Sequence, residues 1–165
     1  MEITYPLTFI PSLKHKHLLL DTNVFRDVAT KPIVFRNFFN ELKKTDITLT
    51  TIDLIKYELL KGSADIAKYK AKETFINEII DACIPLVPET LALVYDLIKM
   101  YGIDGTALSI TDLLLGAILM QYKQNIYLMT RDTTDFMQKI FDLSSIVNIP
   151  HNKGIFTYGV YQYTK

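Results

Sequence analysis

Five acidic side chains lie beside apolar runs of the sequence, where a carboxylate is unfavourable unless something neutralises it. They are Asp21, Glu58, Asp112, Asp132 and Asp135. Proteins hold divalent cations through oxygen ligands, and these ligands are often acids that are dispersed in the sequence and gathered by the fold. The pattern therefore predicts a divalent-metal site.

Strands and helices alternate along the chain, and these elements must position the acids. Short apolar or β-branched runs predict strands at 18–21, 47–50, 84–87, 126–129 and 146–149. Apolar residues at helical spacing predict helices from Pro32 onward and at 51–61, 63–82, 89–101, 109–123 and 133–141. Residues 155–163 are aromatic-rich and strand-like, with Gly159 as a candidate bulge.

Strands separated by helices predict an α/β fold with a parallel sheet. In such sheets, ligands bind beyond the carboxyl ends of the strands, at the point where the strand order reverses. Asp21 ends the first strand, and Asp132 lies just past the strand at 126–129. If the early strands wind one way and the late strands the other, these two strands are neighbours and their acids meet.

The composition limits the class of protein. A chain of 165 residues with 49% hydrophobic and 22% charged residues is typical of one globular domain and excludes general disorder. The formal net charge is zero, so nucleic acid would have to bind a local basic patch. The lone Cys83 cannot form an internal disulfide, and the sequence predicts neither a leader segment nor a run long enough to span a membrane. We expect a soluble cytoplasmic protein without a membrane segment.

Each acid also has an ordinary structural explanation. Asp21 can form an Asx turn or cap a helix, and Ser109-x-x-Asp112 has the spacing of a capping box. Asp132 with Asp135 has that spacing too, which explains Asp135 about as well as a metal does. A glutamate in the middle of a helix, such as Glu58, is usually solvated.

Other chemistries find less support. The three histidines lack metal-binding spacing, and the chain has no glycine-rich phosphate loop and no serine nucleophile elbow. A receiver or phosphatase domain would need an acid next to Asp21 and a lysine at the end of a late strand. Thr22 and Asn23 follow Asp21 instead, and no lysine ends the late strands.

The motifs, taken in order, resemble those of the PIN-domain nucleases. They are Asp21-Thr22-Asn23, then Glu58, then Asp112 leading an apolar helix, then Thr130-Arg131-Asp132-x-x-Asp135-Phe136. The single-domain length is most similar to the VapC toxins of bacterial and archaeal toxin–antitoxin pairs. The resemblance covers about 18–149 and implies one nuclease domain over 1–165. Its expected fold is three-layered, with a parallel sheet ordered 3-2-1-4-5 between helices. Residues 1–16 are then an N-terminal extension and 151–165 an aromatic C-terminal tail.

The resemblance also implies a site. Mg²⁺ or Mn²⁺ is held by Asp21, Glu58, Asp112 and Asp132, with Asp135 as a further candidate. Polar residues that steady these carboxylates in the family correspond to Thr22, Asn23 and Thr130. Candidates for contacts to a substrate backbone, from their positions beside the motifs, are Arg131, Lys56, Lys61 and Arg26.

The implied activity is metal-dependent endoribonucleolytic cleavage of RNA by a two-metal mechanism that leaves a 5′-phosphate. The implied biological setting is a toxin that forms a homodimer and binds an antitoxin protein. The alternative within the same fold is a catalytically degenerate PIN domain that acts as an RNA-binding or assembly module. The complete set of acids favours the nuclease, because a scaffold has no need of such a cluster.

Overall fold

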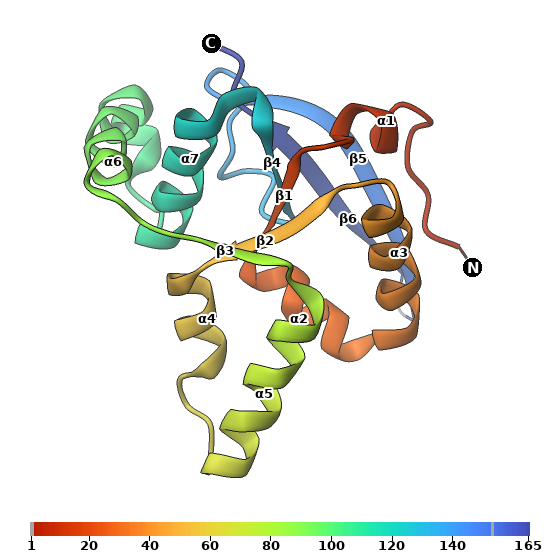
Figure 1. Cartoon of the computed structure of the whole chain (residues 1–165). Coiled ribbons are helices and arrows are strands. Elements are labelled where there is room, and N and C mark those ends of the chain that lie inside the picture. Colours follow the sequence, from red (N-terminus) through yellow and green to blue (C-terminus); the bar gives the residue numbers. More distant parts are fainter. Residues whose placement is uncertain (1, 153) are drawn as a thin grey trace.

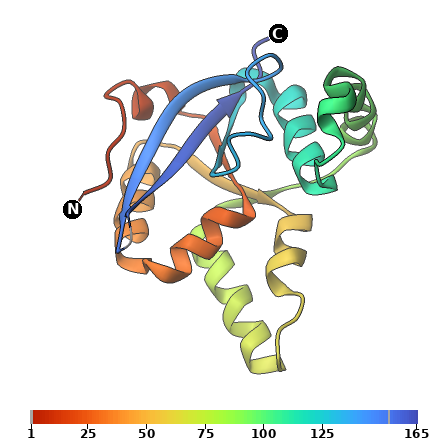
Figure 2. The ribbon, with the colours of Figure 1, turned by 180° about the vertical axis from the view of Figure 1, so that it is seen from behind.

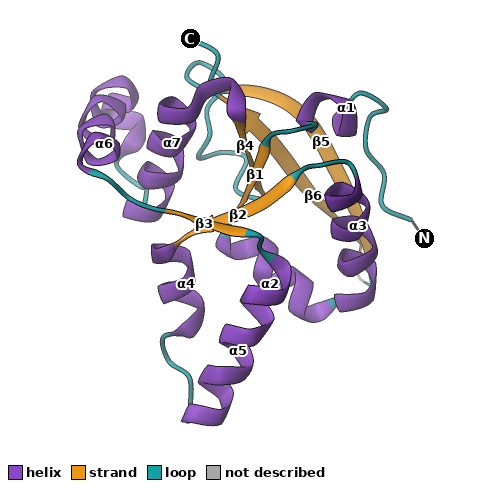
Figure 3. Cartoon of the chain, viewed as in Figure 1, coloured by secondary structure: helices purple, strands orange, loops and turns teal. Residues whose placement is uncertain are grey.

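The computed structural model describes residues 2–152 and 154–165, and these residues form one six-stranded sheet with helices around it (Figures 1 and 3). The strands are β1 (His17–Leu20), β2 (Thr48–Ile52), β3 (Ala82–Ile84), β4 (Ile126–Thr130), β5 (Asp142–His151) and β6 (Gly154–Gln162). Their order across the sheet is β3-β2-β1-β4-β6-β5. The α/β class that was predicted from alternating strands and helices is confirmed.

The first four positions of the sheet are parallel, as expected. β1 pairs with β2 on one side and with β4 on the other, so the strand order reverses at β1, and β3 continues beyond β2. Leu18, Leu19 and Leu20 are fully buried in this central strand. Such continuous apolar runs are typical of strands that are covered on both faces.

The expected order 3-2-1-4-5 is wrong at the other edge of the sheet. β6 lies next to β4 and antiparallel to it, and β5 is outermost and antiparallel to β6. Only two residues separate the end of β5 from the start of β6, and so short a connection can join only antiparallel neighbours. Val160 and Tyr161 of β6 are buried, which gives this strand the apolar surface that a position beside β4 requires.

The aromatic segment that was expected as a C-terminal tail is therefore largely an interior strand. Gly159 is not the bulge, because the irregular register lies between Leu143 and Ser145 of β5. Gly159 instead makes room for a neighbour. A Cβ at this position would lie 2.4 Å from the ring of Tyr161.

The helices are α1 (Phe9–Leu13), α2 (Thr22–Thr30), α3 (Pro32–Lys44), α4 (Asp53–Leu60), α5 (Ile66–Ile79), α6 (Pro88–Tyr101) and α7 (Ile110–Tyr122). Short 3₁₀ turns follow α6 at Gly102–Gly105 and α7 at Lys123–Asn125. In both views α6 and α7 lie together on one side of the sheet, and α3 lies on the other (Figures 1 and 2). The pair α4 and α5 projects from the end of the sheet at which α2 begins.

Two sequence-based expectations about these segments are wrong. Residues 1–16 are not an irregular extension, since they include α1, whose Phe9 and Leu13 are fully buried. No helix forms at 133–141, where the chain makes turns instead. Phe136 and Phe141 of that segment are buried with their rings 5.6 Å apart, so packing into the core overrides a weak helical preference.

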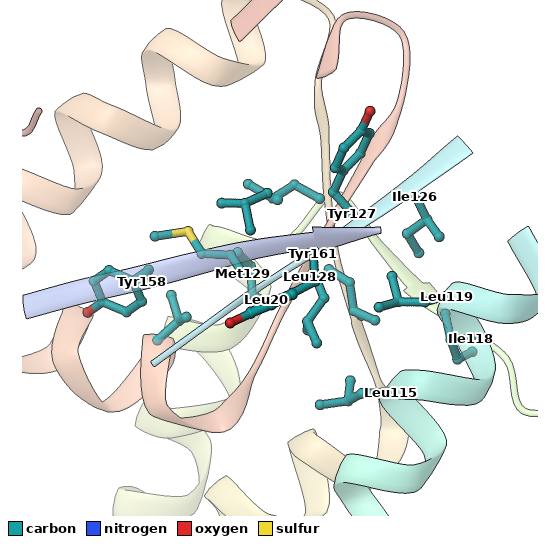
Figure 4. Packing of buried hydrophobic residues seen from close by; sticks show 14 of the residues in the cluster. Leu20, Leu115, Ile118, Leu119, Ile126, Tyr127, Leu128, Met129, Tyr158 and Tyr161 are labelled. Atoms are coloured by element: carbon teal, nitrogen blue, oxygen red, sulfur yellow. The ribbon is translucent and has the colours of Figure 1, made fainter. Parts of the chain in front are cut away.

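One part of the hydrophobic core lies between α7 and the central strands, and the rest includes buried residues of α1, α2 and α3. Figure 4 shows Leu115, Ile118 and Leu119 of α7 on the side of β4 that Ile126 faces, while Tyr127 points away from this helix. Every residue of β4 is buried, so the strand that carries the Thr130 motif is fixed by packing along its whole length. Among the described residues, no helix is both long enough and apolar enough to cross a membrane.

Candidate functional site

Asp21 lies at the carboxyl end of β1, where it also caps α2. Its side chain is only 4% exposed. Oδ1 accepts the Thr22 backbone N–H at 2.6 Å, and Oδ2 accepts the Thr130 hydroxyl at 2.6 Å and the Asn23 amide at 2.8 Å. The capping role and the position at the sheet's switch point thus belong to the same carboxylate.

Asn23 connects the ends of β1 and β4. Its side-chain amide nitrogen lies 2.8 Å from Asp21 Oδ2, 3.0 Å from Thr130 Oγ1 and 3.1 Å from Asp132 Oδ2. Its carbonyl oxygen accepts the Arg131 backbone N–H at 3.2 Å. Because Asp21 and Asp132 accept from the same amide, the meeting of these acids that was expected from neighbouring strands is observed.

Glu58 is half-buried on α4, and two threonine hydroxyls hold its carboxylate. Thr22 at the start of α2 donates to Oε2 at 2.7 Å, and Thr111 at the start of α7 donates to Oε1. Thr111 was not among the residues expected at the site. Its place beside Asp112 in the first turn of α7 was the available signal. These two bonds bring α4 to the same end of the sheet as Asp21.

Asp112 occupies the third position of α7 and forms the expected capping box with Ser109. Its Oδ2 accepts the Ser109 backbone N–H at 2.9 Å and the Ser109 hydroxyl at 2.6 Å. The Ser109 side chain accepts the Asp112 N–H at 3.1 Å in return. Oδ2 carries these bonds, and Oδ1 has no hydrogen bond to the described residues. The cap therefore leaves half of the carboxylate for another ligand.

The acids repel one another. Burial raises the pKa of Asp21, the charges of Asp132 and Asp112 add to that increase and its hydrogen bonds oppose it, so that the pKa is raised to about 6. Burial also raises the pKa of Asp135, and Asp112 and Asp132 add to that increase. No salt bridge in the described part of the chain involves any of these four aspartates or Glu58.

The donor set suits a hard divalent cation, since it is made of carboxylate and hydroxyl oxygens that have no counter-charge. The carboxylates are turned toward hydroxyl and amide donors. As placed, residues 2–152 and 154–165 contain no group of three or more His, Cys, Asp or Glu side chains that could hold one ion. The fit to Mg²⁺ or Mn²⁺ therefore rests on the chemistry of the donors and on the mutual repulsion of the acids.

The basic residues expected to contact a substrate are placed differently from one another. Arg131 is bound within the protein, because its Nε lies 2.9 Å from Asp27 Oδ2 and its guanidinium carbon lies 4.7 Å from the centre of the Phe156 ring. Lys61 lies over the Tyr57 ring. Arg26 and Lys61 line a hollow that Glu58 also lines. Lys56 is half-buried on α4.

A second buried carboxylate, Asp27 of α2, was not expected from the sequence, and it is 5% exposed. The hydroxyl of the fully buried Tyr158 donates to its Oδ2 at 2.5 Å, and Arg131 supplies a positive charge to the same oxygen. Nothing local in the sequence marks Asp27, because its partners come from β6 and from the loop after β4.

The candidate site thus gathers acids from β1, α4, α7 and the loop after β4 at one end of the sheet. Its likeness to the PIN nucleases rests on these residues and on their order in the chain. No protein-family model, curated protein or solved structure matches the chain.

Proposed function

We propose that this protein is a Mg²⁺- or Mn²⁺-dependent endoribonuclease with a PIN-like fold. One observation carries the proposal: Asp21 is buried at the switch point of the sheet, the charges of Asp132 and Asp112 act against its own, and none of the described salt bridges brings a cation of the protein to it. A buried group with a perturbed pKa at such a position is a candidate functional group. The missing positive charge is what a divalent ion would supply.

Asp21, Asp112 and Asp132 are the residues that would hold metal, with Asp21 central to the set. Bound divalent ions would supply activation of a water molecule and stabilisation of the charge on the leaving oxygen. Glu58 would bind metal directly or through water and orient the nucleophile, and the hydroxyls of Thr22 and Thr111 fix its carboxylate for that task. Cleavage in which the 3′ oxygen is the leaving group would leave a 5′-phosphate on the product.

We further propose that the enzyme is the toxin of a toxin–antitoxin pair, works in the cytoplasm and forms a homodimer. Exposed apolar side chains support binding to other protein surfaces. Leu91, Tyr95 and Ile98 of α6 are 51%, 68% and 47% exposed, and Tyr57 and Ile66 beside the α4–α5 turn are 62% and 73% exposed. The lone, partly buried Cys83 is compatible with a reducing compartment.

Cleavage by an Asp21→Asn variant tests the activity. We expect Mn²⁺-dependent cleavage of single-stranded RNA to fall by roughly 100-fold or more, since even outer residues around metals contribute ~10–100-fold. Asp96→Asn is the matched control, because Asp96 is exposed and pairs with Lys99 on its own helix. Wild-type rates in the Asp21→Asn variant would exclude this site.

Calorimetric titration with Mg²⁺ and Mn²⁺ at millimolar concentration tests the metal separately. Wild type should bind, and both Asp21→Asn and Asp132→Asn should bind more weakly. Failure of the wild type to bind either ion would count against a metal-dependent enzyme. RNA binding that persists without metal-dependent cleavage would instead favour the catalytically inactive RNA-binding module.

A further inference from the structure

A hollow of about 360 Å³ lies between α2, α4 and α5, directly beside the candidate site. Glu58 lines it, and the carboxylate of Glu58 is bound by Thr22 and Thr111 of the site. The volume falls in the range typical of small-ligand pockets. A molecule that occupied this hollow would therefore border the acidic cluster.

Three cations surround the hollow: Arg26 from α2, Lys61 from the α4–α5 connection and Lys72 from α5. All three are exposed, and none takes part in a salt bridge within the described part of the chain. A chain with zero net charge thus places three cations and one carboxylate, that of Glu58, around one hollow, which leaves the hollow with a net positive charge. An anionic ligand would be attracted to it.

The interior of the hollow is apolar. Leu59, Phe75 and Ile76 line it together with Phe25, and Phe75 is partly exposed. A basic rim over an apolar and aromatic interior matches the two halves of a nucleotide, because the phosphate binds cations and the base packs on an aromatic face. A free phosphate would use only the rim.

We propose that this hollow binds a single nucleotide of the RNA strand, next to the phosphate that is cleaved. This inference rests on the proposed function and names the part of the substrate that lies beside Glu58. Arg26 and Lys72 hold the backbone from opposite helices, and Phe75 receives the base. The unpaired base must be free to turn outward, so the substrate is single-stranded at this position.

The test removes the two cations that come from different helices, in the double variant Arg26→Gln/Lys72→Gln. We expect KM for a short single-stranded RNA to rise about tenfold, with kcat changed less than twofold. The matched control is Lys68→Gln/Lys70→Gln, which removes the same charge from exposed positions of α5 that do not line the hollow. The control should keep the wild-type KM.

A binding experiment separates this inference from the proposed activity. RNA affinity is measured against salt concentration in the Asp21→Asn background, which does not depend on cleavage. Each cation that no longer neutralises a phosphate of a single strand should lower the log–log salt slope by about 0.7. Equal slopes and equal KM in the double variant and its control would overturn the inference, while the metal-dependent cleavage by wild type would still stand.

Two further measurements are decisive. If the double variant keeps RNA affinity but no longer binds the protein encoded by a neighbouring gene, the hollow belongs to a protein partner and the nucleotide inference is wrong.

The variant Phe75→Leu, which keeps an apolar side chain, tests the base contact. Weaker RNA binding by this variant, with an unfolding midpoint within a few degrees of wild type, supports the contact. Unchanged RNA affinity in Phe75→Leu would remove the base from the proposal.

Discussion

Two buried aspartates at helix α2, one at its N-cap and one within it, have surroundings that differ in one respect. Asp27 is 5% exposed, and Arg131 and the Tyr158 hydroxyl bind its carboxylate at 2.9 Å and 2.5 Å. Asp21 is 4% exposed and receives only neutral donors, while Asp112 and Asp132 oppose its charge. The protein therefore compensates one buried carboxylate internally and leaves the other uncompensated.

This difference separates a structural role from a functional one. A buried ion pair with its hydrogen bonds made is complete, and removal of one partner leaves an unbalanced charge. A buried carboxylate that faces other carboxylates is stabilised only when a proton or a cation arrives from outside. Asp27 should therefore matter for folding, and Asp21 should matter for what the folded protein binds.

Removal of Asp27 should have the largest effect on stability. Asp27→Ala leaves Arg131 and Tyr158 without their acceptor, and loss of one member of a buried pair costs about 3–5 kcal/mol. We expect the lower end of that range, because Arg131 is partly exposed. Urea unfolding in EDTA measures the change, with Asp21→Ala compared under the same conditions. Equal losses in the two variants would erase the distinction between the two aspartates.

The pH dependence of metal-free stability should come largely from Asp21. The pKa of Asp21 is raised from 3.8 to about 6, so between these values the folded protein holds a proton that the unfolded chain has lost. Stability is highest below about pH 4 for this group and falls as pH rises to about 6, by at most about 3 kcal/mol. Asp135, whose pKa is also raised, acts in the same direction.

Unfolding midpoints in EDTA at about pH 4.5 and about pH 7 measure this fall. The difference between the two midpoints should shrink in Asp21→Asn, which cannot ionise at that position. Mg²⁺ added at the higher pH should stabilise wild type more than the variant, since a ligand that binds only the folded state raises its stability. An identical pH dependence in both proteins would show that Asp21 is not the uncompensated group.

Two buried threonines on different strands sharpen the comparison for activity. The Thr130 hydroxyl donates to Asp21 and accepts the Asp132 N–H at 3.0 Å, whereas Thr50 Oγ1 is buried without a hydrogen-bond partner among the described residues. Thr130→Val keeps the shape and should reduce metal affinity or cleavage by about 10–100-fold, as for other residues that orient metal ligands. Thr50→Val should leave both unchanged. Equal behaviour of the two variants would mean that Thr130 does not position the acids.

The sequence predicted the central elements of the fold better than it predicted the far edge of the sheet. Asp21, Asp112 and Asp132 each follow or begin an apolar run that forms β1, α7 or β4, so local patterns were sufficient to place them. The position of β6 was not predictable, because the sequence of a strand-like aromatic segment does not determine which strand it pairs with. Asp27 was missed for the same reason, since its acceptor role depends on Tyr158, 131 positions later in the chain.

The smallest expected effect isolates the hydroxyl of Tyr158. Tyr158→Phe keeps the ring and its edge contact with Phe35, and leaves Asp27 paired with Arg131. The loss should be about 1 kcal/mol in urea unfolding, the usual net contribution of one hydrogen bond.

The same variant also tests a link between the two regions, because Arg131 precedes Asp132 in the chain. It asks whether the contacts of Asp27 with Tyr158 and Arg131 hold the loop that carries Asp132. Unchanged cleavage and metal affinity would show that Arg131 alone is enough to hold that loop. A loss of metal affinity beyond the loss of stability would instead show that the two aspartates of α2 are coupled through Arg131.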